Sequence, residues 1–117
     1  MQITTYSVEE RLSIYDKAIQ LINKHYGIEM RTATRKRKFT EARFLFIYLM
    51  KERIKMKLIN VELGNVINKH RTTVTTNAKK MAHWIKHYDE LAQIATEIGE
   101  QIDNFIITKI QANEKSN

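Results

Sequence analysis

Apolar residues in this chain recur three and four positions apart in five successive segments. That spacing places them on one face of an α-helix, whereas alternation at every second residue would indicate a strand. Proline is absent and glycine occurs only three times, so few positions interrupt a helix. The pattern predicts an all-α protein with helices over residues 8–27, 40–56, 61–67, 71–88 and 89–112.

The N-terminal segment has a defined start and end. Ser7 and Glu10 have the spacing of a capping box, in which the serine side chain bonds the backbone N–H of Glu10 and the glutamate reaches back. Gly27 is a natural stop. Nothing in this segment suggests chemistry, so we expect a supporting helix. Its predicted core-facing residues are Val8, Leu12, Tyr15, Ile19, Ile22 and Tyr26.

The second segment is expected to be the most buried helix. Thr40 is predicted to cap it, and it runs to about Met56. Its aromatic residues are more typical of a core than of stacking platforms for bases. The apolar surface comprises Ala42, Phe44, Leu45, Phe46, Ile47, Tyr48, Leu49 and Met50, with Arg53 at its edge.

A short helix follows, over residues 61–67, with Asn60 as its predicted cap. Leu63, Val66 and Ile67 are expected to face inward. Gly64 lies inside this helix, where it costs stability relative to alanine. We therefore expect a neighbouring helix or a phosphate to approach closely at that position.

The segment from Arg71 organises the chain. Its predicted inner face is Val74, Ala78, Met81, Ile85 and Tyr88, and its outer face is Thr72, Thr73, Thr76, Lys79, Lys80 and His83. The outer face carries hydrogen-bond donors and positive charge but no acid. Four threonines and a valine at residues 72–76 start a helix poorly, because β-branched side chains lose rotamer freedom there. Together with the helix before it, this segment predicts a helix–turn–helix whose second helix is kept for contact.

The C-terminal segment carries the longest apolar stripe: Leu91, Ile94, Ala95, Ile98, Ile102, Phe105, Ile106 and Ile110. Two interpretations stay open from the sequence. The stripe either packs back onto the first helix or offers a surface to another protein chain. Residues 112–117 have no pattern and are expected to fray.

Length and charge narrow the possibilities. The 117 residues suit a single domain with one modest core. The net charge is +7, but residues 31–87 alone hold fifteen Lys/Arg against three Asp/Glu, between flanks of net negative charge. A basic middle is the footprint of a protein that binds a polyanion, although a solvated lysine-rich surface would have the same composition.

Apolar runs, the N-terminal residues and the cysteine count indicate where in the cell the protein is expected. The longest apolar run is Phe44 to Met50, far too short for a membrane span. There is no signal-peptide pattern and no cysteine, so a cytoplasmic protein without disulfides is expected.

The sequence contains no catalytic or metal-binding pattern. There is no glycine-rich phosphate loop and no Ser-His-Asp arrangement. His83 and His87 have the i, i+4 spacing of a metal pair, but a site needs a third ligand. Glu62, the carboxylate nearest a helix cap in the basic region, is expected to lack a partner. We expect no catalysis, no metal and no cofactor.

The basic stretch 31–38 has no apolar periodicity. It has two possible interpretations. The first is an ordinary soluble surface. The second is a segment that contacts DNA, as a phosphate clamp or as an arm in the minor groove, since arginine suits the negative potential of a narrow groove. Its place just before a helix–turn–helix favours the second interpretation.

These features together resemble the C-terminal DNA-binding domain of the bacterial replication initiator DnaA. The likeness covers roughly residues 8–105. It rests on the basic run from Arg35 to Arg43 with Tyr48-Leu49, on Leu63-Gly64, on Thr72-Thr73-Val74, and on His25-Tyr26-Gly27-Ile28. The initiator's ATPase domain has no counterpart in these residues, so the resemblance implies a free-standing bacterial or phage relative.

The resemblance implies a Trp-repressor-like helical topology and binding to double-stranded DNA, in replication or in regulation. Arg35 and Arg37 would reach the minor groove and Arg43 a phosphate. Bases would be read by Arg71, Thr72 and Thr73, and phosphates or the groove edge held by Lys69, His70, Lys79 and Lys80. The chain departs from the family pattern at Phe44, Val61, Asn68 and Arg71, which alters the expected target sequence.

The rival interpretation is a protein-interaction module. In it the C-terminal helix binds a second copy or another protein, and the basic surface binds an acidic partner or a membrane surface. Binding that is strongly salt-dependent and retains a preferred DNA sequence would separate the two.

Overall fold

The computed structural model describes residues 6–111, and every regular element within them is helical. The elements are α1 (Val8–Tyr26), α2 (Arg37–Arg53), α3 (Ile59–Ile67), α4 (Arg71–His87), α5 (Asp89–Phe105) and the π-helical segment η1 (Ile106–Gln111). The all-α prediction is confirmed. The expectation for residues 112–117 lies outside the described residues. None of the helices in the described range is long and apolar enough to cross a membrane.

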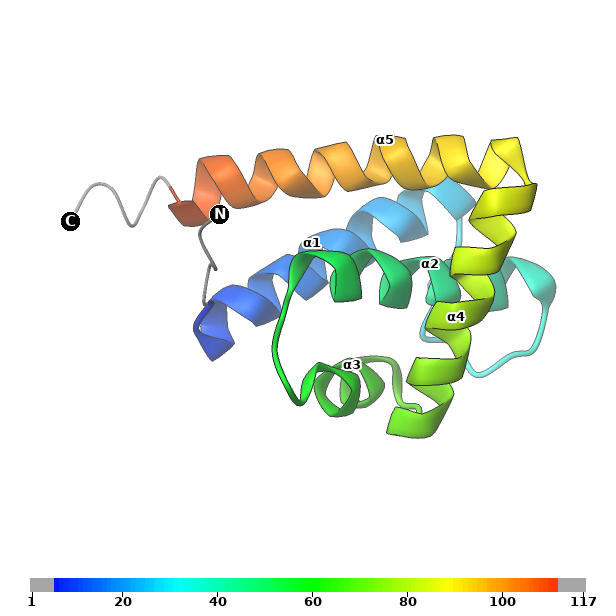
Figure 1. The fold of residues 1–117 in the computed structure, drawn as a ribbon, viewed down its shortest axis with the longest axis horizontal. Helices are drawn as coiled ribbons and strands as arrows, with labels where there is room; N and C mark the ends of the chain where they lie inside the picture. The colour runs from blue at the N-terminus through cyan, green and yellow to red at the C-terminus, as the bar shows by residue number, and fades with distance from the viewer. Residues whose placement is uncertain (1–5, 112–117) are drawn as a thin grey trace.

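Helix α2 lies at the centre of the molecule. In Figure 1, α5 runs above α2 and α3 lies below it, while α4 rises past one end of α2 from the level of α3 to the start of α5. Helix α2 packs against each of the other four helices, most extensively against α4. The expectation that α2 is the most buried helix is confirmed, and its aromatic residues Phe44 and Phe46 belong to the core. Its buried residues are Ala42, Arg43, Phe44, Leu45, Phe46, Ile47, Leu49 and Met50.

The ends of α1 are as predicted. Glu10 N–H donates to Ser7 Oγ at 3.1 Å and Ser7 N–H donates to Glu10 Oε1 at 2.8 Å, which completes the capping box. Gly27 ends the helix in the left-handed region, at φ 66°. Its predicted inner face is wrong at Val8 and Leu12, which are exposed. Both α2 and α5 pack on α1, and the face that they share is centred on Ile14, Tyr15, Ala18, Ile19 and Ile22.

Helix α2 does not begin at Thr40. It starts at Arg37, after Lys36, whose carbonyl accepts from the backbone N–H of Thr40 at 3.1 Å, and it ends at Arg53 rather than Met56. The exposed first turn leaves no apolar periodicity to reveal it. Arg37 and Lys38 therefore belong to this helix and not to the loop before it.

Helix α3 begins one residue before its predicted cap. Asn60 does not cap it: the Nδ2 of Asn60 donates to the hydroxyl of Thr75 on α4 at 2.9 Å. The inward placement of Leu63 and Ile67 is confirmed, with Val66 half-buried.

The stripe of α5 packs onto the first helix, which decides between the two open interpretations. Its buried residues include Leu91, Ala95, Ile98 and Ile102, and the stripe continues through η1 to Ile106 and Ile110. Tyr88, predicted to face the core, is 55% exposed. It joins α4 to α5 in an extended conformation, at φ −127° and ψ 104°, so it lies outside the helical periodicity that predicts its inward direction.

Candidate nucleic-acid interface

Helices α3 and α4 form a helix–turn–helix with a tight turn. Asn68 takes the left-handed conformation at φ 60°, and Lys69 N–H donates to the carbonyl of Gly64 at 2.7 Å. A Cβ at Gly64 would collide with the carbonyl oxygen of Lys69 and would touch Val74 of α4. The predicted close approach at Gly64 is thus made by the turn and by the helix that follows it.

The start of α4 has a cap that the sequence did not reveal. Nδ1 of His70 accepts from the backbone N–H of Thr72 at 3.2 Å. The hydroxyls of Thr75 and Thr76 donate to carbonyls one turn earlier, at 3.3 and 3.1 Å. These bonds stabilise a turn whose β-branched residues favour other conformations. Only the position of His70, just before the first helical residue, hinted at this role.

The outer face of α4 is as predicted. Its residues Thr72, Thr73, Thr76, Lys79, Lys80 and His83 are all exposed, and so is Arg71. On the inner face Val74 and Met81 are buried, whereas Ala78 and Ile85 are half-buried. Among the described residues, no group bonds the hydroxyl of Thr73. That hydroxyl is free to donate to or accept from a bound molecule.

Most cations in this region have no internal counter-charge. Of the fifteen Lys/Arg between residues 31 and 87, Arg31 pairs with Glu29, Arg53 pairs with Asp103, and Arg43 is buried. Across the described part of the chain, the other twelve have no carboxylate within salt-bridge distance. They are Arg35, Lys36, Arg37, Lys38, Lys51, Lys55, Lys57, Lys69, Arg71, Lys79, Lys80 and Lys86. Charges that are not neutralised internally attract anions from solution.

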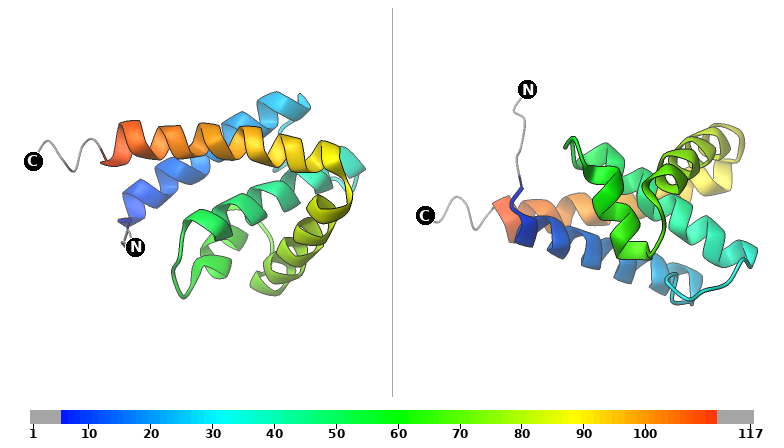
Figure 2. Two further views of the ribbon diagram at one scale, coloured as in Figure 1. Left: turned by 45° about the horizontal axis from the view of Figure 1, so that its top comes forward. Right: turned by 90° about the horizontal axis from the view of Figure 1, so that it is seen from below.

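The loop between α1 and α2 lies toward the same end of the molecule as α4. Figure 1 and the two views of Figure 2 place both away from the end where α1 begins. Arg35 and Lys36 on this loop are exposed. The fold thus gathers the basic loop, residues 31–36, and the polar face of α4 at one end, although Lys36 and Arg71 are 35 positions apart in the sequence.

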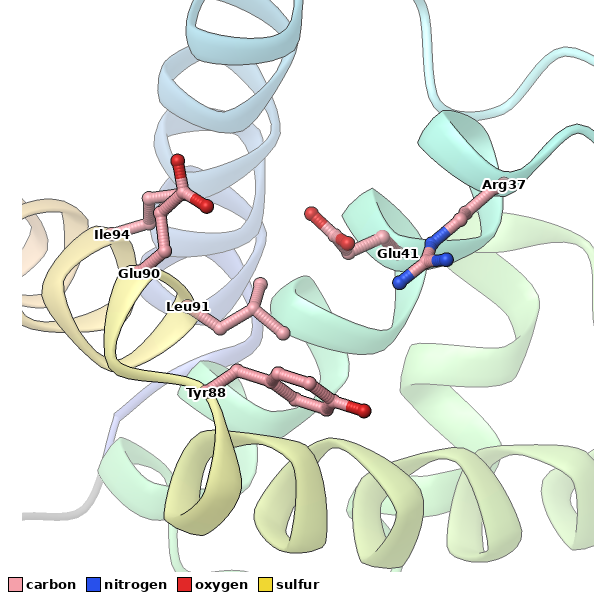
Figure 3. Close-up of a pocket in the computed structure, with 6 residues that line it drawn as sticks. All are labelled: Arg37, Glu41, Tyr88, Glu90, Leu91 and Ile94. Atoms are coloured by element: carbon pink, nitrogen blue, oxygen red, sulfur yellow. The ribbon is translucent and has the colours of Figure 1, made fainter.

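Arg37 differs from Arg35 in its surroundings. It lines a hollow of about 250 Å³ with Glu41, Tyr88, Glu90, Leu91 and Ile94. Figure 3 shows its guanidinium turned toward this hollow, with the Glu41 carboxylate nearby. Glu41 also accepts from the hydroxyl of Tyr26 at 2.5 Å. Arg37 is therefore exposed but close to acidic side chains, so Arg35 is the more available of the two for a phosphate or a groove.

Arg43 is not placed to contact a phosphate, and that prediction is wrong. Its side chain is 6% exposed and donates to three backbone carbonyls of the segment before α2, those of Met30, Thr32 and Thr34. Arg43 lies on the same face of α2 as Ile47 and Met50, three to four residues apart, which was the available signal that it points inward.

Glu62 is not without a partner. Arg11 of α1 donates to both of its carboxylate oxygens, at 2.8 and 3.0 Å, and the Tyr15 hydroxyl donates at 2.5 Å. The guanidinium of Arg11 is the main cause that holds the pKa of Glu62 below its ordinary value. Burial, with the nearby carboxylate adding to it, raises the pKa of Tyr15. This cluster ties α1 to α3 and has a structural role.

In the described part of the chain, no three His, Cys, Asp or Glu side chains are grouped to hold a metal ion. His83 and His87 lie side by side on α4, with ring centroids 4.4 Å apart.

Comparison with protein-family models, with curated proteins and with solved structures finds no match to this chain. The likeness to the DnaA DNA-binding domain therefore stays a prediction from the residues.

Proposed function

We propose that this protein binds double-stranded DNA in a sequence-specific way, with α4 in the major groove and the basic loop in the minor groove. One observation carries the proposal. The exposed face of α4, directly after a tight turn, consists of donors and cations, and residues 71–87 include no acid. A helix with this surface complements both the phosphates and the acceptor-rich edges of bases.

The roles within α4 follow from position. The first residues of the second helix are the ones that meet base edges in a helix–turn–helix. Arg71, Thr72 and Thr73 hold these positions and are exposed. Arginine can donate two bonds to guanine, and a threonine methyl can pack on thymine. Lys69, Lys79 and Lys80 would hold phosphates, and His70 could do so through Nε2, because Nδ1 serves the helix cap.

Arg35 would enter the minor groove, with Arg37 beside it at the start of α2. Arg43 no longer belongs to the contact set, because carbonyls occupy its guanidinium. The resemblance to DnaA supports the same arrangement of grooves and suggests a role in replication or in regulation. The interaction-module alternative loses support, because the apolar stripe of α5 is already buried against this chain.

The direct test is a selection of duplexes from random DNA by the purified protein. The preferred duplex is then titrated at several salt concentrations. If roughly five phosphates are neutralised, log K against log[salt] should slope at about −4 to −5. A slope near zero would remove the DNA proposal. Salt-dependent binding without any preferred sequence would favour an acidic partner instead.

Base reading is tested by a pair of variants. Arg71→Ala should relax the preference at one guanine by about 1–3 kcal/mol. Lys80→Ala, the matched control on the same helix, should weaken binding to all sequences alike. Both are measured on the preferred site and on its single-base variants. Equal losses by Arg71→Ala on every variant would show that it only positions the helix.

A further inference from the structure

Among the described residues, Arg43 is the one charged residue that is buried. Nε donates to the carbonyl of Met30 at 2.6 Å, Nη1 donates to that of Thr34 at 3.0 Å, and Nη2 donates to that of Thr32. Within residues 6–111 it has no carboxylate partner. Burial lowers its pKa, since the charged form is taken out of water.

A cation is buried at such cost only where its hydrogen bonds are well formed. Here all three go to alternate carbonyls of one segment, residues 30–34, which has no regular secondary structure. That segment ends directly before Arg35. The other hydrogen bonds of this segment are mostly local: the backbone N–H and guanidinium of Arg31 donate to the Glu29 carboxylate, and Lys36 N–H donates to Thr34 Oγ1 at 3.3 Å. Met30 N–H donates to Asn23 Oδ1 at 2.9 Å, and Thr32 N–H donates to the carbonyl of Glu29 at 3.0 Å.

We infer that Arg43 is a positioning residue for DNA binding, which clamps the loop over residues 30–34 and so holds Arg35 toward the DNA. This inference rests on the proposed function. A loop that is ordered before binding loses less conformational entropy on binding, so the clamp raises the affinity without touching the DNA.

The geometry also explains why arginine is needed. Its planar fork presents donors in several fixed directions, whereas lysine has one ammonium group at the end of a flexible stem. Lysine at this position would keep the charge but could not reach three carbonyls that lie on different sides of the guanidinium. Arg43→Lys is therefore expected to behave like a loss of the clamp.

The first arm of the test needs no DNA. Amide hydrogen exchange is measured in the wild type, in Arg43→Met and in Arg43→Lys. Both variants should speed exchange at the hydrogen-bonded amides of Met30, Thr32 and Lys36 by about tenfold or more, with α4 and α5 little changed. Arg53→Met is the matched control, because Arg53 is the other shielded arginine of α2 and pairs with Asp103 at the far end. It should leave the loop unchanged. Unchanged loop exchange in both Arg43 variants would overturn the clamp.

The second arm is a double-mutant cycle with Arg35→Ala on the preferred duplex. Arg43→Met alone should weaken binding by about tenfold, the size expected when a loop must be ordered on binding. In the Arg35→Ala background, Arg43→Met should weaken binding by about twofold or less, since the Arg35 side chain that Arg43 positions is already absent. A direct phosphate contact by Arg43, or a loss of global stability, would instead give additive effects and overturn the positioning role.

The two arms separate the inference from the proposed function. If the wild type binds no DNA, the positioning role falls with the proposed function, while loop exchange still decides whether Arg43 clamps the loop. Should Arg43→Met not fold, Arg43→Lys serves in both arms, because it keeps the charge and the length of the side chain.

Discussion

Helices α4 and α5 have the same length and meet at Tyr88, yet their sequences follow different rules. Each has 17 residues. Helix α4 contains four Lys/Arg, two His and no acid, whereas α5 contains five Asp/Glu and no Lys/Arg. Helix α5 buries five residues, and α4 buries three, one of which is the polar Asn77.

The two helices differ in how much of their sequence the core explains. In α5, apolar residues meet α1 and polar residues face water, so the core explains the pattern. In α4, packing explains Val74 and Met81 but not the threonines and lysines on the outside. The hydroxyls of Thr75 and Thr76 bond carbonyls one turn earlier, but no contact within the described residues accounts for the exposed hydroxyl of Thr73 or for the lysines. Such a surface is expected where a helix serves a partner.

The largest effect on DNA affinity should come from reversing charge on the outer face of α4. We predict that Lys79→Glu with Lys80→Glu weakens binding to the preferred duplex by about 100-fold or more, because like charges against phosphates cost several kcal/mol. Fluorescence anisotropy of a labelled duplex would measure the affinity.

The matched control is Glu97→Lys with Glu100→Lys on α5, where both residues are exposed. This change should leave the affinity unchanged or raise it. If both pairs of substitutions weaken binding to the same extent, α4 has no special place in the contact and the comparison fails.

The next largest effect is on stability and concerns Gly64 and Gly99, the two glycines that lie within helices. Gly64→Ala should destabilise the protein by about 2 kcal/mol, because the Lys69 carbonyl would have to move and alanine's higher helix propensity offsets only part of that cost. At Gly99 the nearest atom belongs to the guanidinium of Arg53, which can turn aside. Gly99→Ala should therefore stay within about 1 kcal/mol of the wild type, on either side.

Urea unfolding can measure both changes through Trp84, the chain's one tryptophan, whose ring stacks on Phe44 at 5.3 Å between centroids. Equal stability of the two variants would mean that the turn after α3 yields as easily as a side chain. The close approach of the Lys69 carbonyl to Gly64 would then contribute nothing to the free energy of unfolding.

Local features of the fold could be predicted from the sequence. Apolar periodicity identified every helix and the exposed face of α4, and residue type identified the capping box of α1. These signals depend on residues that are a turn or less apart in the chain. The exposed first turn of α2 has no such pattern, so its start at Arg37 was missed.

Features that depend on distant partners could not be predicted. Glu62 accepts hydrogen bonds from Arg11 and Tyr15, which precede it by 51 and 47 positions. The side chain of Arg43 bonds carbonyls that lie 9 to 13 positions earlier, in an irregular loop. In the sequence Arg43 is one cation among many in a basic stretch. Its helical spacing from Ile47 and Met50 indicates that it turns inward while Arg35 stays exposed, but nothing in the sequence identifies the loop carbonyls that it bonds.

The smallest predicted effect is on the stability of the protein and concerns Glu62, a carboxylate within the basic region of residues 31–87. Glu62→Gln should destabilise the protein by about 1–2 kcal/mol at neutral pH, since the charge-assisted bonds from Arg11 are weakened. Its folded pKa lies below the ordinary value of 4.5, so the ion pair stabilises fully above that pH and is lost as the pH falls through the folded pKa. The stability difference between the wild type and Glu62→Gln should therefore shrink in acid. The same substitution at Glu100 on α5, an exposed residue, should change stability by less than about 0.5 kcal/mol at every pH. Urea titrations of the three proteins across the acid range give the answer, and a difference at Glu62 that does not depend on pH would show that shape rather than charge joins α1 to α3.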